Sequence, residues 1–164
     1  MQLFVLDWDA KAAAEMLCDV HLRKMCLETA QILSGVIFLQ GKKPTAGMPG
    51  LYNVKHPVIR SIDTPEKINW VILCNEALHR NYLKRFGKVH AYSLLAPEYR
   101  KILFTDDVSI SKESLTFARN FKDIEITEPD LVLAYRIYYR CKKHILKNWH
   151  YTNSSEPDWL REEK

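Results

Sequence analysis

The feature that most constrains this chain is a long helical pattern over residues 9–39. Residues 10–14 are strong helix formers, and the side chain of Asp9 can cap them. Gly41 is suited to end the helix, and we expect a break near residues 17–19. Because apolar side chains occupy most of the circumference of this helix, other elements of the fold have to bury it.

A second long helix is predicted after Thr64-Pro65-Glu66, where a hydroxyl cap, a proline and an acid stand in the order of a helix start. This helix should run to Phe86 and stop at Gly87. The remaining expectations are an extended arm or short strand at 2–6, a loop at 41–63, a short helix at 89–95 before Pro97, a short helix at 111–121, a helix from 127–130 to about Lys147, and an irregular polar tail at 151–164.

The size and composition of the chain fit one helical domain. Its 164 residues suffice for a real core, and 47% apolar with 27% charged residues is ordinary for a globular protein. Strand signal is nearly absent beyond residue 6, and no internal repeat is evident. We therefore predict an all-α fold, a compact single-domain bundle over residues 1–164 with a short extended segment at its N-terminus.

The cysteines and the first residues indicate a cytoplasmic protein, in the host cytoplasm if a phage encodes it. Cys18, Cys26, Cys74 and Cys141 form no C-x-x-C pair, so we expect reduced thiols. The start of the chain lacks the pattern of a signal peptide, and no apolar run has the length of a membrane span. The net charge of +4 permits a polyanionic partner without requiring one.

A polar stripe on the first helix is the main candidate for chemistry. His21, Lys24, Glu28 and Gln31 share one narrow face at 100° per residue. Charged groups on a largely buried helix are costly unless they face a cleft or find partners, which favours a functional site. The alternative is a solvated face in which Lys24 and Glu28 form an ordinary i,i+4 pair.

A loop and the last helix supply candidate contacts to nucleic acid. The His-Pro loop at residues 55–60 can return to the stripe with donors for phosphate. Residues 135–151 hold basic and aromatic side chains without a single acid, which suits phosphates and bases, although part of this window can equally be core beside a solvated face. The predicted nucleic-acid-binding residues are Lys24, Arg23, His56, Arg60, Arg136, Arg140, Lys142, Lys143, Lys147 and Trp149. A second basic group, Arg80, Lys84, Arg85 and Lys88, can extend this surface or simply complement a helix C-terminus.

The first helix resembles the phage pyrimidine-dimer DNA glycosylase family, also called the endonuclease V type. The matching residues are Asp19-Val20-His21-Leu22, with Glu28 seven residues after the histidine. The resemblance covers about ten residues, together with a terminal segment of similar basic and aromatic character. It implies a compact helical fold, a glycosylase with abasic-site lyase activity, a free N-terminal α-amine as nucleophile, and Glu28 as the catalytic carboxylate.

The hypothesis is therefore a DNA-repair or DNA-processing glycosylase that acts on double-stranded DNA and needs neither cofactor nor metal. Met1 should be retained before Gln2, so its α-amine would be the nucleophile, with Glu28 and His21 as the other catalytic residues. An α-amine, with a pKa of about 8 against about 10 for lysine, is the more nucleophilic amine at neutral pH. Two alternatives stay open: a non-catalytic nucleic-acid-binding or phage counter-defence protein, and a metal-dependent phosphoesterase using Asp19, His21, Glu28 and His56.

Overall fold

The computed structural model describes residues 1–50, 53–122 and 124–161, and within these ranges all regular structure is helical. The elements are α1 (Ala10–Glu15), α2 (Asp19–Leu39), α3 (Pro57–Arg60), α4 (Pro65–Phe86), the 3₁₀ helix η1 (Ala91–Leu95), α5 (Ala96–Leu103), α6 (Leu131–Ile145) and the 3₁₀ helix η2 (Asp158–Leu160). The prediction of an all-α fold with an extended N-terminal segment is confirmed.

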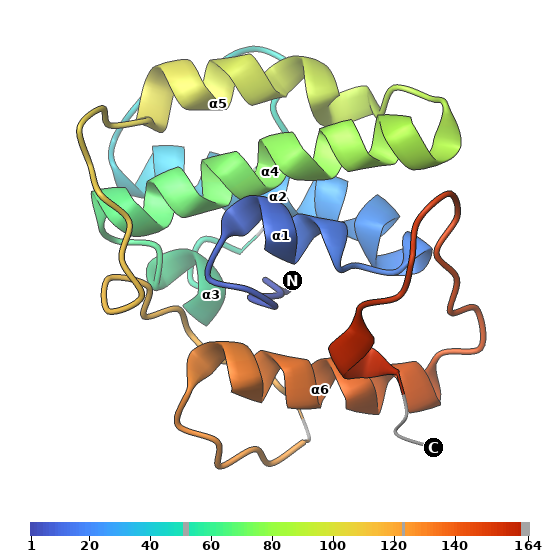
Figure 1. Cartoon of the computed structure of the whole chain (residues 1–164). Coiled ribbons are helices and arrows are strands. Elements are labelled where there is room, and N and C mark those ends of the chain that lie inside the picture. Colours follow the sequence, from blue (N-terminus) through green and yellow to red (C-terminus); the bar gives the residue numbers. More distant parts are fainter. Residues whose placement is uncertain (51–52, 123, 162–164) are drawn as a thin grey trace.

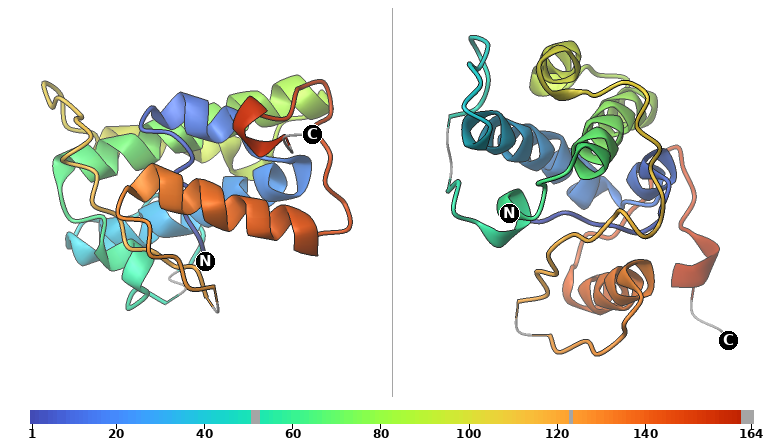
Figure 2. Two further views of the ribbon diagram at one scale, coloured as in Figure 1. Left: turned by 60° about the horizontal axis from the view of Figure 1, so that its bottom comes forward. Right: turned by 90° about the vertical axis from the view of Figure 1, so that its left-hand side faces the viewer.

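Helix α4 is the centre of the larger helical layer, where it packs on α1, α2 and α5. Helix α6 lies on the other side of the molecule, and the first residues of the chain pass between α6 and this layer (Figures 1 and 2). Residues 3–6 are buried and each side chain is at most 6% exposed. Residues 2–6 therefore run through the interior of the fold, while Met1 itself is half-buried.

The start of the second long helix follows the sequence prediction closely. The hydroxyl of Thr64 accepts the main-chain N–H of Lys67, and Pro65 occupies the first turn of α4. The helix ends at Gly87, whose φ of 63° lies in the left-handed region that glycine adopts at little cost. Local caps of this kind are short-range signals, which is why both ends could be placed from the sequence.

A buried arginine stabilises the break between α1 and α2. Helix α1 ends at Glu15, and α2 starts at Asp19. The Arg85 guanidinium donates to the carbonyl oxygens of Glu15 (2.8 Å) and Leu17 (2.7 Å) and pairs with Asp19 (3.2 Å). Carbonyl oxygens at a helix end lack intrahelical hydrogen-bond donors, so the Arg85 side chain supplies the donors that the carbonyl groups between α1 and α2 need.

Between residues 41 and 121 the structure differs from the sequence expectations in three places. The short helix expected at 89–95 is present as the 3₁₀ helix η1, but Pro97 does not end the helical stretch: it stands in the first turn of α5, where its missing N–H costs nothing. Residues 111–121 form turns and extended chain in place of the expected helix. The loop expected at 41–63 contains the single helical turn α3.

The C-terminal tail packs on the fold, although its sequence is polar. The carbonyl oxygen of His150 accepts the N–H of Asp19, and Thr152 donates to the Asp19 carboxylate, so the tail caps the start of α2. Leu160, in η2, is 2% exposed. The last part of the tail expected from the sequence, residues 162–164, lies outside the described residues. Among the described residues no helix combines the length and the apolar character needed to cross a membrane.

Candidate active site

The first residue of the chain lies beside the carboxylate of Glu28, on α2. The α-amino nitrogen of Met1 is 3.8 Å from Oε1 of Glu28, and the main-chain N–H of Gln2 donates to Oε2 at 3.0 Å. The Asn120 side chain donates to the carbonyl oxygen of Met1 at 3.0 Å. The main chain of the first residue is thus held from both sides.

Solvent reaches the main chain of Met1 more readily than its side chain. The Met1 side chain is 2% exposed, whereas the residue as a whole is half-buried. Glu28 is 8% exposed. Lys24, one turn earlier on α2, places its ammonium group 3.4 Å from Oε1 of Glu28 and is itself 55% exposed. Two ammonium groups therefore share one nearly buried carboxylate, and Lys24 is the member of the group on the solvent side.

His56 joins this cluster from the cap of α3. Its Nδ1 accepts the N–H of Val58 at 3.2 Å, so a neutral His56 carries its proton on Nε2. Burial and then the positive charge of the Met1 amino group lower the pKa of His56, while Glu28 acts in the opposite direction. The charges of the Met1 amine and of Glu28 both act on the His56 ring, so the His-Pro loop lies within electrostatic range of this cluster.

His21 lies in the core instead of in this cluster. Its Nδ1 is 3.0 Å from the Tyr139 hydroxyl, and its ring packs against Phe4 and Trp149. Burial, followed by the charges of Lys24 and Lys142, lowers the pKa of His21 to about 4, so the ring is neutral at pH 7. Within the described residues no hydrogen bond joins His21 to Glu28 or Met1, and the ring joins α2 to α6.

Three of the five Lys and Arg residues in 135–151 bind the protein's own chain. Arg136 donates to the Leu6 carbonyl oxygen (2.8 Å) and pairs with Asp7 (3.2 Å), Arg140 donates to the carbonyl oxygen of Trp159, and Lys143 pairs with Glu156 (3.0 Å). The window has no acid of its own, but acids and carbonyl groups from distant segments balance it. These three side chains hold the N-terminal segment and the tail against α6.

The other predicted contacts to nucleic acid are distributed unevenly. Lys142 lies over the Tyr138 ring (5.0 Å), and its charge, like that of Lys24, lowers the pKa of His21. Trp149 is half-buried and donates to Glu156 at 3.1 Å. Arg60 and Lys147 are exposed, and Arg23 is also exposed but covers the Phe86 ring. Of the second basic group, Arg85 is 1% exposed and serves the helix junction.

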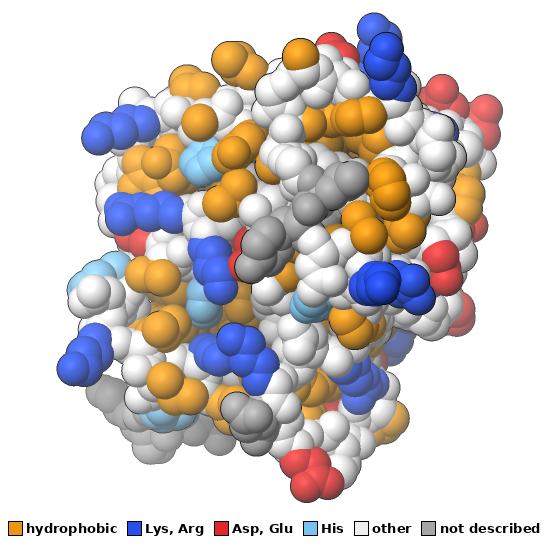
Figure 3. Space-filling view, turned by 180° about the vertical axis from the view of Figure 1, so that it is seen from behind, with side chains coloured by type: hydrophobic (Ala, Val, Ile, Leu, Met, Phe, Trp, Pro, Cys, Tyr) orange, Lys and Arg blue, Asp and Glu red, His pale blue; other side chains and the backbone are white. Residues whose placement is uncertain are grey.

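The face of the molecule on which the chain begins is mainly basic. Figure 2 places the N-terminus on the side turned away from the viewer of Figure 1. On that side Lys and Arg side chains are spread over the surface, and most of the acidic side chains lie towards its margin (Figure 3). The amine and the carboxylate therefore belong to a face with the charge that a polyanion requires.

The residues named for a metal-dependent phosphoesterase are not brought together. The Asp19 carboxylate faces Arg85 and Thr152, and these contacts lower its pKa although burial opposes them. His21 is bonded to Tyr139, away from His56. In the described ranges, the histidine, cysteine and acidic groups that do converge are Cys26, His79 and His90. Sequence reasoning missed them because they come from three separate elements and share no spacing signal.

Comparisons with protein families, with curated proteins and with solved structures found no match to this chain.

Proposed function

We propose that this chain is a DNA glycosylase with abasic-site lyase activity whose nucleophile is the α-amino group of Met1. The observation that carries the proposal is the separation of 3.8 Å between this nitrogen and the Glu28 carboxylate. An amine next to a fixed carboxylate is the pair that imine chemistry at a sugar carbon needs: one group attacks, and the other moves protons and stabilises positive charge.

The bonds can be followed through each step. The neutral Met1 amine attacks C1′ of the deoxyribose; the bond from C1′ to the base breaks, and the base leaves with the electron pair and takes up a proton. The nitrogen then loses a proton, the C1′–O4′ bond breaks as the nitrogen lone pair forms the C=N bond, and O4′ takes up a proton to become a hydroxyl, which gives an iminium ion. Removal of a proton from C2′ then expels the 3′ phosphate by β-elimination. Water finally hydrolyses the iminium and regenerates the amine.

Glu28 has two roles in this scheme. Its Oε2 holds the N–H of Gln2, which fixes the position of the nitrogen one residue earlier. Its Oε1 faces the amine and stabilises the cationic sugar and the iminium, while it also accepts and returns protons. Because Glu28 is 8% exposed, these charge interactions are less screened than they would be in water.

Access to the amine requires a nucleotide that has left the stack. Turning a nucleotide out of duplex DNA costs a few kcal/mol, and less at a damaged site. Lys24, 55% exposed beside Glu28, is the side chain that an entering phosphate would draw towards solvent. Lys142 and Lys147 are then available for flanking phosphates, and the Nε2–H of His56 can donate to the sugar or phosphate.

The experiment is borohydride trapping on duplex DNA with one abasic site, followed by peptide mass spectrometry. The expected result is one covalent adduct on the nitrogen of Met1. A chain extended by a cleavable segment ahead of Met1 should give no adduct, and cleavage that leaves Met1 first should restore it. An adduct on a lysine side chain would overturn the amine assignment.

The alternative of a binding protein without chemistry is distinguished in the same experiment. Such a protein would bind abasic-site DNA with the extension still in place and would give no adduct in either form. Intact mass measurement of the protein before the reaction shows whether the α-amine is free, so a blocked amine is not mistaken for lack of activity.

A further inference from the structure

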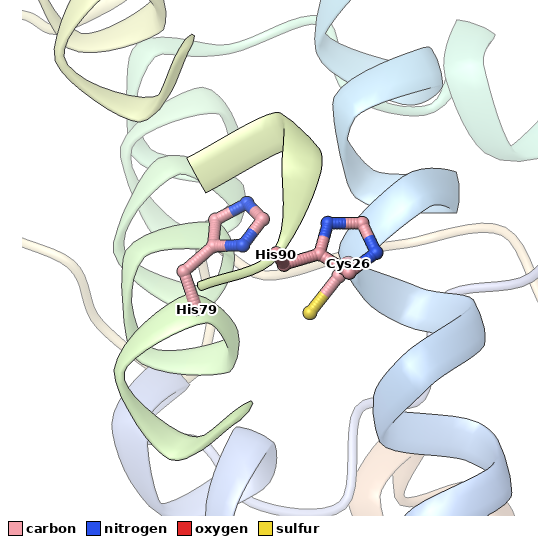
Figure 4. A group of neighbouring side chains, drawn as sticks. All are labelled: Cys26, His79 and His90. Atoms are coloured by element: carbon pink, nitrogen blue, oxygen red, sulfur yellow. The ribbon is translucent and has the colours of Figure 1, made fainter. Parts of the chain in front are cut away.

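A second group of reactive side chains lies between α2, α4 and η1. Cys26 comes from α2, His79 from α4 and His90 from the cap of η1, and one ligand atom from each lies within 4.8 Å of the others (Figure 4). Cys26 is 0% exposed and His79 is 6% exposed, whereas His90 is half-buried. The group is closed on the side of the helices and open on the side of His90.

His79 has an unused nitrogen at this point. Its Nδ1 is buried and has no hydrogen-bond partner within the described part of the chain. A buried polar atom without a partner costs on the order of 1–3 kcal/mol, so the fold has a reason to place one only if something binds there. The nitrogen belongs to a ring that faces a thiol and a second imidazole, which are ligands for the same class of metal ion.

The other nitrogen of His79 belongs to a buried polar chain. Nε2 lies 3.4 Å from the side-chain nitrogen of Asn75, which donates to the Thr29 hydroxyl at 2.8 Å, and that hydroxyl donates to the Met25 carbonyl oxygen at 2.7 Å. The Asn75 oxygen is also buried without a partner within the same described residues. Asn75 therefore lies at Nε2 of His79 and leaves Nδ1 as the nitrogen of this ring that has no partner among the described residues.

We propose that Cys26, His79 and His90 form a site for Zn²⁺, with water or another small ligand in the fourth position. Thiolate and imidazole are the usual ligands of this ion, and three protein ligands with one open position are typical of accessible zinc sites. Zinc bonds of about 2.0–2.3 Å would draw the three atoms closer than the present upper limit of 4.8 Å. His90, at the start of a short 3₁₀ helix, is the ligand that can make this adjustment.

The protonation states fit a site that loads with release of one proton. Burial lowers the pKa of His79 to about 4, so its ring is already neutral at pH 7. Burial raises the pKa of Cys26 to about 12, so the thiol keeps its proton until a cation replaces it. Metal affinity should therefore rise with pH.

This site is separate from the candidate active site. Cys26 and Glu28 are two residues apart on α2, which places them about 200° apart around the helix. Zinc would join α2, α4 and η1 on the side away from the Met1 amine, so the expected effect is on folding stability. The zinc site does not depend on the glycosylase proposal.

Zinc binding is tested by exposing chelator-treated protein to Zn²⁺, removing excess metal by gel filtration and measuring the retained metal. We expect one zinc per chain in the parent protein, and loss of it in His90→Ala, His79→Ala and Cys26→Ala. Free Zn²⁺ at about 100 times its Kd should shift the unfolding equilibrium roughly 100-fold. In the parent, Co²⁺ in place of Zn²⁺ should give thiolate charge-transfer absorption that Cys26→Ala removes.

Two control variants give the test its specificity. His144→Ala removes an exposed histidine on α6, and Glu28→Gln changes the amine cluster; both should retain zinc. Circular dichroism of each variant checks that it is folded. Because His90 is half-buried in a loop, His90→Ala is the variant for which we expect the smallest effect on folding. Absence of retained zinc in the parent, or loss of zinc on changing Glu28 and not His90, would overturn the proposal.

Discussion

Glu28 holds the first two residues of the chain with its two oxygens: Oε2 accepts the N–H of Gln2 at 3.0 Å, and Oε1 lies 3.8 Å from the α-amino nitrogen of Met1. The hydrogen bond to the peptide is shorter than the contact to the amine. The carboxylate therefore fixes the amine through the neighbouring residue, and in the proposed reaction its other oxygen is the one beside the amine.

Glu28→Gln should distinguish the role of Glu28 in positioning the Met1 amine from the role of its negative charge. The amide oxygen of glutamine can still accept the N–H of Gln2, so the fold and DNA binding should persist. The carboxylate's role in proton transfer is lost, and we expect the single-turnover rate on abasic-site DNA to fall by roughly 100-fold or more. A rate within a few fold of the parent, with Met1 still trapped, would show that Glu28 has no catalytic part.

Arg85→Met should be among the most destabilising single changes. It removes the donors to the Glu15 and Leu17 carbonyl oxygens and leaves the Asp19 carboxylate without its charged partner. Breaking a buried pair from one side costs about 3–5 kcal/mol. Urea unfolding measures this loss, and Arg80→Ala, at an exposed position of the same helix, should change stability by less than about 0.5 kcal/mol.

Stability should fall as the pH is lowered below neutrality. The pKa of His21 is about 4 in the folded protein and 6.5 unperturbed, so the unfolded chain binds the extra proton between these values. The free energy of unfolding therefore decreases as pH falls, by about 2 kcal/mol between pH 6.5 and pH 5 for this one group. His21→Asn should reduce the pH slope over this interval in urea titrations; an unchanged slope would contradict the buried neutral ring.

Gly35→Ala should destabilise the protein although alanine favours helices. An added Cβ would lie 2.9 Å from Cδ1 and 3.0 Å from Cγ2 of Ile59, which is fully buried in α3. Overpacking costs about 1–3 kcal/mol against a propensity gain of about 1. Because α3 carries His56 at its cap, the rate of borohydride trapping should fall as well. Gly50→Ala, where no described atom lies within 4 Å, is the matched control for thermal unfolding.

Two basic residues of α6 should behave differently in DNA binding. Lys142→Ala removes an ammonium group that lies over the Tyr138 ring and should reduce the slope of log affinity against log salt by about 1. Arg136→Ala removes the hydrogen bond to the Leu6 carbonyl oxygen and the ion pair with Asp7. It should lower the free energy of unfolding and leave the salt slope of DNA binding unchanged. Fluorescence anisotropy at several salt concentrations measures both. A reversed order would show that the ties across α6 open on binding DNA.

The parts of the fold that the sequence predicted are those with local causes. Thr64 and Gly87 bound α4 through contacts within one helical turn, and the periodicity of residues 9–39 indicated the α1–α2 stretch. The expectation that Pro97 follows the end of a helix was wrong, because proline is as compatible with the first turn of a helix as with the residues after its end. The expected helix at 111–121 failed because tertiary packing, and not helix propensity, decides such short segments.

The candidate site was predictable as far as one helix could show it. The spacing of Lys24 and Glu28 placed both on one face, and the resemblance pointed to the amine. The role of His21 was missed because its partner, Tyr139, is 118 residues away, and the balance of Arg136 by Asp7 spans 129 residues. Contacts of this separation leave no periodic trace in a sequence.

Because residues 2–6 lie between α6 and the other helices, this segment cannot reach its native packing until α6, about 130 residues further along the chain, has also been synthesised. The Phe4 ring stacks on the Tyr138 ring of α6, and the Leu6 carbonyl oxygen accepts a hydrogen bond from Arg136 of the same helix. The docking of residues 2–6 is therefore a late, long-range step of folding, because it depends on contacts to α6 that are far away in the sequence.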